Sequence, residues 1–253
     1  MRLQGTYNCE GGGRLARFAR DHVNAMLVYA SEHAVSMAGE FDALCRRHFG
    51  SPLGEAQTPN ELRPVDIYQG LRHFSSWPQL KRNELIQACL NIMLRRATPL
   101  IISYINKQEL ADAKSDDDSP SALYQNTTEP VISRFLFALT MFVDEINMSS
   151  RSHAQIMAGQ LPVSDFAMVV AQNETSVEPR YMTDFLQSED GRDATAILNN
   201  FCFVDSEHSV GSQLSNLCAY FVRRWLQNPA SSHPYFETLR DNKVIQVIYP
   251  VTV

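Results

Sequence analysis

The alternation of helical and extended patterns is the feature that most constrains this chain. Residues Gln79–Arg96 have a helical spacing, with apolar residues on one side at Leu80, Leu85, Ala88, Cys89, Ile92 and Met93. Pro99 disfavours helix at the residue before it, and the apolar run Leu100–Ile105 that follows is typical of a strand. A helix that leads directly into a strand is typical of α/β proteins.

The same alternation continues along the whole chain. The expected strands are Leu3–Cys9, Asn24–Tyr29, Leu100–Ile105, Phe166–Gln172, Leu198–Val204 and Val244–Tyr249. The expected helices are Val35–Phe49, Gln79–Arg96, Val131–Asn147, Tyr181–Leu186 and Val210–Leu226. In the first helix, the apolar stripe is expected to contain Val35, Ala38, Phe41, Leu44 and Cys45. The sequence therefore predicts an α/β fold, a mixed sheet with helices on its faces, in a single domain that spans residues 1–253.

Two segments interrupt this alternation. Residues 51–78 are rich in Pro, Gly and Asn, which predicts a long irregular crossing. Residues 112–120 contain three consecutive aspartates and end in Pro120, which predicts an exposed and mobile loop.

Composition narrows the possible classes of protein. The formal charge is 22 − 28 = −6, so nucleic-acid binding would need a local basic patch and is not indicated by net charge. The five cysteines form no Cys-x-x-Cys pair, which favours a reducing compartment over a disulfide framework or a zinc site. No apolar run follows Met1, and no apolar stretch is long enough for a membrane span, so we expect a cytoplasmic protein without a membrane partner.

Polar residues follow three of the predicted strands. They are Glu10 after the first strand, Asn173-Glu174 after the fourth, and Asp205-Ser206 after the fifth. In open α/β sheets, ligands bind beyond the carboxyl ends of the strands, so these residues are candidates for one shared site. Gln213, Asn216 and Tyr220 form a polar stripe on the last long helix that could face the same crevice.

Each of these candidates also has a purely structural interpretation. Glu10 is compatible with an exposed turn, and Asp205 and Ser206 are compatible with a helix cap. Asn216 is compatible with a polar position on a partly buried helix.

The same segments resemble a large, mostly uncharacterised family of bacterial and phage proteins, a domain of unknown function with an RNase H-like fold. The family's opening Tyr-x-Asp-Glu-Ser-Gly is matched by Tyr7-Asn8-Cys9-Glu10-Gly11-Gly12. A Glu-Leu-His segment is matched by Glu61-Leu62-Arg63, and a central Asp-Glu by Asn173-Glu174. The closing Phe-x-Asp-Ser and Gly-x-Gln-Leu-Ala-Asp are matched by Phe203-Val204-Asp205-Ser206 and Gly211-Ser212-Gln213-Leu214-Ser215-Asn216.

The resemblance implies an RNase H-like sheet in which carboxylates hold divalent metal for phosphodiester cleavage. Three of the expected acids are replaced by neutral residues, namely Cys9, Asn173 and Asn216. Mg²⁺ and Mn²⁺ prefer hard oxygen ligands, and cleavage with two metals needs several carboxylates. No cofactor is therefore expected, except weakly bound Mg²⁺ or Mn²⁺ at Glu10, Glu174 and Asp205, with Glu61, Gln213 and Ser206 as supporting residues.

The sequence thus predicts a catalytically impaired, pseudo-nuclease-like binding or regulatory protein, whose setting in a bacterial or phage mobile element or integron cassette comes from the resemblance. One alternative is a metal-dependent nuclease that uses Glu10, Glu174 and Asp205, with Glu61 or Asp66 brought in from the crossing. Another is a protein-interaction or dimeric subunit, in which the apolar helix 131–143 contributes to a homodimer or partner interface. The partner and substrate are left open.

Overall fold

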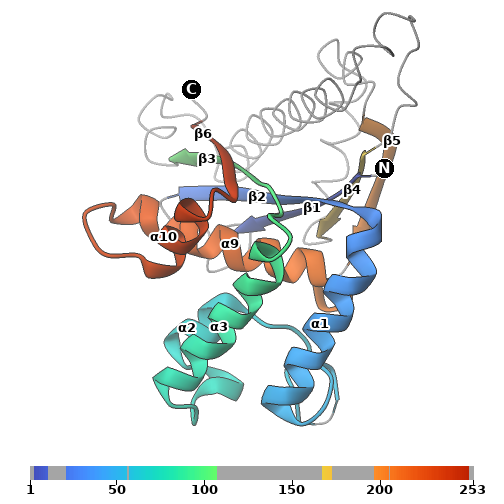
Figure 1. The fold of residues 1–253 in the computed structure, drawn as a ribbon. Coiled ribbons are helices and arrows are strands. Elements are labelled where there is room, and N and C mark those ends of the chain that lie inside the picture. The colour runs from blue at the N-terminus through green and yellow to red at the C-terminus, as the bar shows by residue number, and fades with distance from the viewer. Residues whose placement is uncertain are drawn as a thin grey trace, which may run out of the picture.

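The chain folds as a mixture of helices and one sheet, in agreement with the predicted α/β class (Figure 1). The computed structural model describes residues 3–10, 21–55, 57–106, 167–172, 197–204 and 206–250. The strands are β1 Leu3–Glu10, β2 Asp21–Ala30, β3 Leu100–Asn106, β4 Ala167–Gln172, β5 Ile197–Val204 and β6 Ile245–Pro250. The helices are α1 Ser31–Phe49, α2 Pro64–Gln69, α3 Gln79–Leu94, α9 Val210–Gln227 and α10 Pro234–Asp241, with short 3-10 turns η2 Arg72–Phe74 and η3 Ser206–His208.

The strands form one sheet in the order β5-β4-β1-β2-β3-β6. β2 is antiparallel to both of its neighbours, β1 and β3. β4 is parallel to β1, β5 is parallel to β4, and β6 is parallel to β3. Strand β2 is therefore the only reversed strand among those described, and the carboxyl ends of the other strands share one edge of the sheet.

One face of the sheet is covered by α9, which packs on β1 and β2 (Figure 1). Alternate residues of β2, from Val23 to Tyr29, are buried in the core that this helix shares with α1 and α3. Leu100 and Ile102 of β3 belong to the same core. Met26 and Ile101 are paired with each other across β2 and β3, and both are fully buried outside that cluster. The strands therefore have apolar residues on both faces, as expected for the interior of an α/β protein.

The helices confirm the predicted elements but correct two of the predicted stripes. In α1 the buried stripe is Met37, Phe41 and Cys45, at successive i+4 positions, whereas Val35 is 79% exposed. In α3, Leu80 is 71% exposed because it lies in the first turn, at the end of the helix far from the sheet (Figure 1). The spacing of apolar residues in the sequence identified each helix. Which positions on the helix are buried depends on the elements that pack against it.

The prediction of an irregular crossing over 51–78 is wrong in part, because the segment contains α2 and η2. Pro64 stands at the first helical position of α2, and Gly70 ends it with a φ of 70° and an N–H that donates to the helix carbonyls. These are ordinary helix-boundary signals. Helix α10, which begins at Pro234, was not predicted either.

Several predictions fall outside the described residues. They are the loop 112–120, the helices 131–147 and 181–186, and the interface proposed for 131–143. Among the described residues, no helix is both long and apolar enough to cross a bilayer.

Candidate functional site

The carboxyl ends of β1, β4 and β5 meet at one edge of the sheet. The three strands are adjacent and parallel, with Tyr7 paired to Ala171 and Ala171 paired to Phe203. β1 ends at Glu10, β4 at Gln172 and β5 at Val204. This edge is the position at which open α/β sheets usually bind ligands.

The strand register separates two of the predicted site residues. Glu10 is paired with Val23, which lies in the core beneath α9, and Cys9 is paired with Asn24. Consecutive strand positions alternate between the two faces of a sheet. Cys9 and Glu10 therefore occupy positions on opposite faces, although both are at the carboxyl end of β1.

Helix α9 begins at the same edge, because only Asp205, η3 and Ser209 separate it in the sequence from the end of β5. The Ser209 hydroxyl accepts a hydrogen bond from the Ser212 backbone N–H, at 3.2 Å, and caps the helix. Gln213, one turn further on, is only 4% exposed, and its side-chain oxygen accepts a hydrogen bond from the Leu62 backbone N–H at 2.9 Å. This bond holds the segment around residue 62 against α9, so two of the predicted supporting positions, Glu61 and Gln213, are brought together.

Beside this contact lies a cavity of about 510 Å³, within the range of roughly 300–1,000 Å³ that is usual for small-ligand sites. Its walls come from the segment before α2, from α2 and η2, and from η3. The residues that line it are Pro59, Asn60, Glu61, Arg63, Asp66, Arg72, His73 and Glu207. The cavity therefore combines three carboxylates with two guanidinium groups and one imidazole.

Two of these carboxylates are each paired with an arginine. Arg63 Nε donates to Glu61 Oε1 at 2.5 Å, and Arg72 Nε lies 3.5 Å from Asp66 Oδ2. The acids are the more buried partners, with side chains 17% and 10% exposed, whereas the side chains of Arg63 and Arg72 are 50% and 63% exposed. The cavity thus has acidic groups on its inner wall and guanidinium groups towards solvent.

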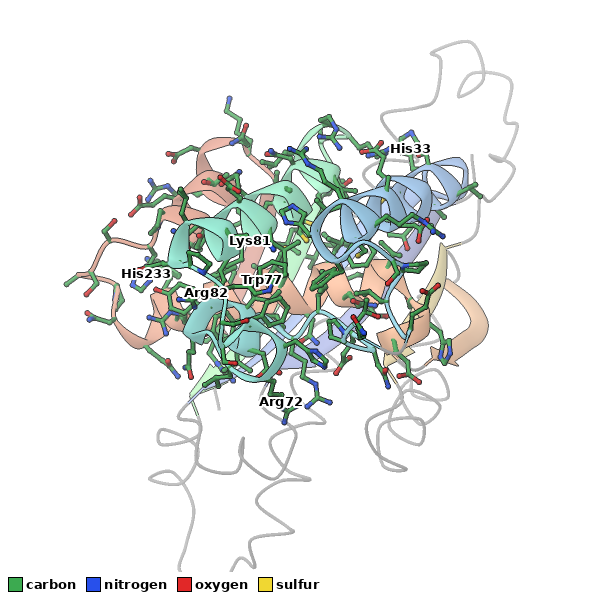
Figure 2. The ribbon with its side chains drawn as sticks, turned by 90° about the horizontal axis from the view of Figure 1, so that it is seen from below. His33, Arg72, Trp77, Lys81, Arg82 and His233 are labelled. Atoms are coloured by element: carbon green, nitrogen blue, oxygen red, sulfur yellow. The ribbon has the colours of Figure 1, made fainter. Side chains whose placement is uncertain are left out.

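The backbone at Arg72 is unusual. Its φ is 51°, a left-handed conformation that side-chain-bearing residues adopt rarely and at a cost of roughly 1–2 kcal/mol. The turn follows Leu71, whose N–H donates to the Asp66 carbonyl at 2.8 Å. Figure 2 shows Arg72 at the margin of the described ribbon, projecting away from it. The left-handed turn therefore carries the guanidinium past Asp66 towards solvent.

The predicted polar stripe on α9 is mostly core. Gln213 and Tyr220 are buried, and only Asn216 is half-buried. The Tyr220 ring packs against Tyr68 and Phe221, and burial raises the pKa of its hydroxyl. Tyr220 therefore serves the contact between α2 and α9 and does not line the cavity.

The remaining candidates are placed as follows. Asn173, Glu174 and Asp205 lie outside the described residues, and Cys9, Glu10 and Ser206 are described only by their backbone. Their convergence stays a prediction. Within the described segments, no group of three or more His, Cys, Asp or Glu side chains is arranged to hold a metal ion.

Sequence reasoning missed Arg72, His73 and Glu207. A signal for Glu207 was present, because it follows the predicted Asp205-Ser206 directly after a strand. Arg72 and His73 follow Gly70, whose role as a helix end would have placed a turn there. Their position beside η3 depends on long-range packing.

Comparison with known proteins matches this chain to no family model, and it finds no significantly similar curated protein.

Proposed function

We propose that this chain is an RNase H-like protein that binds its ligand without metal-dependent cleavage. The proposal combines the resemblance in the sequence with the arrangement of the sheet and the chemistry of the cavity. Its setting in a bacterial or phage mobile element is part of the same proposal and rests on the resemblance.

The strand order supports the RNase H-like part of the proposal. In RNase H-like folds the first strand is central, the second and third strands lie on one side, and the fourth and fifth on the other, with only the second reversed. Strands β5-β4-β1-β2-β3 have this order, and β2 alone is reversed. β6 is then an additional strand at the β3 edge.

The observation that carries the non-catalytic part is the pairing of cavity acids with arginines. A divalent metal needs carboxylate oxygens whose charge is available to it, and two-metal cleavage needs several. The Arg63 guanidinium already neutralises Glu61, and Arg72 partly neutralises Asp66. These were the acids that the sequence offered as additions from the crossing, so their pairing removes support from the nuclease alternative.

The first experiment measures cleavage and metal binding by the natural protein. Single-stranded DNA, duplex DNA and an RNA·DNA hybrid are incubated with Mg²⁺ or Mn²⁺, with EDTA as the blank. We expect no cleavage above the blank. Metal-dependent cleavage that disappears in Glu10→Gln or Asp205→Asn would establish the nuclease alternative instead.

A second experiment tests the pairing itself. The double change Arg63→Gln and Arg72→Gln unpairs two carboxylates, so Mn²⁺ should raise the Tm of this variant more than that of the natural protein. Arg240→Gln is the matched control, because Arg240 is also paired through Nε, to Asp241, and is 59% exposed. An equal Mn²⁺ effect in all three proteins would show that the arginines do not take the place of a metal.

A third experiment restores the missing acids. If Cys9, Asn173 and Asn216 are the degenerate positions, replacing all three with Asp should create divalent-metal binding. The metal-free triple variant should be less stable than the natural protein, because clustered carboxylates repel one another. The absence of any metal-dependent difference by calorimetry would refute the erased-site hypothesis.

A further inference from the structure

We infer that Arg63 and Arg72 form a clamp for a phosphate group at the cavity beside α2. The chemical class of ligand is a phosphate ester, supplied either by a nucleic-acid backbone or by a free nucleotide. This inference deepens the proposed function by naming its ligand, and it rests on that proposal only for the suggestion of nucleic acid.

The guanidinium groups of Arg63 and Arg72 are held in the same way. Each contacts its carboxylate through Nε, which leaves the terminal Nη groups for another acceptor. In the part of the chain that the structure describes, neither guanidinium group has any other hydrogen bond or ion pair. An arginine positioned by an acid on one side presents a planar fork of N–H donors on the other, which suits phosphate oxygens.

Other arginines of the fold are engaged differently. Arg82 Nη1 donates to the carbonyls of Ile67 and Tyr68, and Arg95 and Arg96 both contact Glu40 through Nη2. The Arg224 guanidinium lies over the Tyr68 ring, 4.4 Å from its centroid. These side chains stabilise contacts between helices, so the fold itself accounts for them.

Pairing through Nε is not by itself a site. Arg46 with Asp42 and Arg240 with Asp241 have the same geometry, and neither arginine lines the cavity. What distinguishes Arg63 and Arg72 is that both border one cavity, together with His73. The cavity volume accommodates a nucleotide-sized group and is much larger than a bare ion needs.

The distribution of charge decides which part of the cavity the phosphate would contact. Formally, Glu61, Asp66 and Glu207 carry three negative charges against two positive charges from the arginines, so the cavity as a whole does not attract an anion. Glu61 and Asp66 lie inside and the two guanidinium groups lie outside, with exposed fractions of 10–17% against 50–63%, whereas the Glu207 side chain is 40% exposed. A phosphate therefore binds at the outer rim, on the Nη groups, while the acids fix the direction of each fork.

The test uses the full chain in EDTA and fluorescence anisotropy of labelled single-stranded DNA and RNA. Competition with inorganic phosphate and with a nucleoside monophosphate separates the two sources of ligand. We expect Arg63→Gln and Arg72→Gln each to weaken binding about tenfold, the usual size of one lost charge-assisted hydrogen-bonding group. Arg240→Gln removes the same charge from the same kind of pair elsewhere, and it should change affinity by less than about twofold.

Two conservative variants test whether the effect of the Gln substitutions comes from loss of the fold. Arg63→Lys and Arg72→Lys keep the charge but remove the fork, so each should still weaken binding if the geometry matters. Competition by the small phosphates at concentrations similar to those of the oligonucleotide assigns the site to free phosphate esters, and competition only by oligonucleotides assigns it to a backbone. No binding of any phosphate probe, or equal binding by the Arg63, Arg72 and Arg240 variants, would overturn the clamp. These two outcomes would not change the interpretation of the metal experiments above. Metal-dependent cleavage, in contrast, would overturn the proposed function but not the phosphate clamp.

Discussion

Gln213 of α9 and Leu62 of the segment before α2 are joined by a buried hydrogen bond, although 151 positions separate them in the sequence. The Gln213 side-chain oxygen accepts from the Leu62 backbone N–H at 2.9 Å. This bond connects the wall of the cavity to the helix that crosses the sheet, so the stability of the fold and the shape of the cavity depend on the same contact.

Replacing Gln213 with Leu should leave the buried Leu62 N–H without its acceptor. We expect the free energy of unfolding to fall by about 1–3 kcal/mol, the usual effect of an unsatisfied buried donor. Urea denaturation measures it. Gln227→Leu, at the exposed end of the same helix, is the control and should change stability by less than about 0.5 kcal/mol. Equal effects of the two substitutions would show that the hydrogen bond does not contribute.

Gly70→Ala should destabilise the protein more than Gly54→Ala. Both glycines have positive φ, of 70° and 82°, so each substitution introduces backbone strain of roughly 1 kcal/mol. Only at Gly70 would the new Cβ meet a neighbour, at 2.9 Å from the Arg82 guanidinium, which is held by the carbonyls of Ile67 and Tyr68. Thermal or urea unfolding of both variants gives the comparison, and an equal loss would show that Arg82 moves aside without cost.

Burial of Cys45 should make the protein less stable in alkali. Desolvation, with a smaller contribution from Asp42, raises the pKa of this thiol from 9.0 to about 12. Above pH 9.0 the thiol ionises in the unfolded chain but stays protonated in the folded protein, so stability falls as the pH rises from 9.0 towards 12. Burial raises the pKa of Cys89 and Cys218 as well, and both act in the same direction.

The measurement is the free energy of unfolding of the natural protein and of Cys45→Ala at about pH 8 and about pH 10.5. The decline with pH should be smaller in the variant, because it lacks the buried thiol of Cys45. Groups that titrate identically in both proteins cancel in this comparison. An equal fall in the free energy of unfolding in both proteins would show that the Cys45 thiol does not contribute to the pH dependence.

Glu40 should contribute stability that disappears in acid. Hydrogen bonds from Arg96 and then Arg95 hold the pKa of its carboxyl below the usual 4.5. The contribution is therefore present above pH 4.5 and is lost as the pH falls through the lowered pKa of the folded state. Because Glu40 is 37% exposed, we expect Glu40→Gln to cost no more than about 1 kcal/mol at neutral pH.

The check for Glu40 is the difference in unfolding free energy between the natural protein and Glu40→Gln. It should shrink as the pH is lowered from about 7 to about 3. Asp42→Asn on the same helix is a suitable reference, since Asp42 pairs with the exposed Arg46. A difference that stays constant with pH would exclude the ion pairs as its source.

The sequence by itself determined the local elements. Strands β1 to β6 and helices α1, α3 and α9 overlap predicted segments, because hydrophobic periodicity and breakers such as Pro99 act over neighbouring residues. Helices α2 and α10 were missed although each begins at a proline, since both are short, with six and eight residues. The α/β class followed from the order of the elements alone.

Only the tertiary structure decided which residues share a site. Arg72, His73 and Glu207 line one cavity because α2 is packed on α9 and because Gln213 holds the segment at Leu62. Strand alternation also placed Cys9 and Glu10 on opposite faces, which the match to a motif of consecutive residues did not reveal. Periodicity in the sequence indicates which positions of a helix or strand are buried. A binding site depends on contacts between elements that are distant in sequence. The site therefore forms only when those elements pack together.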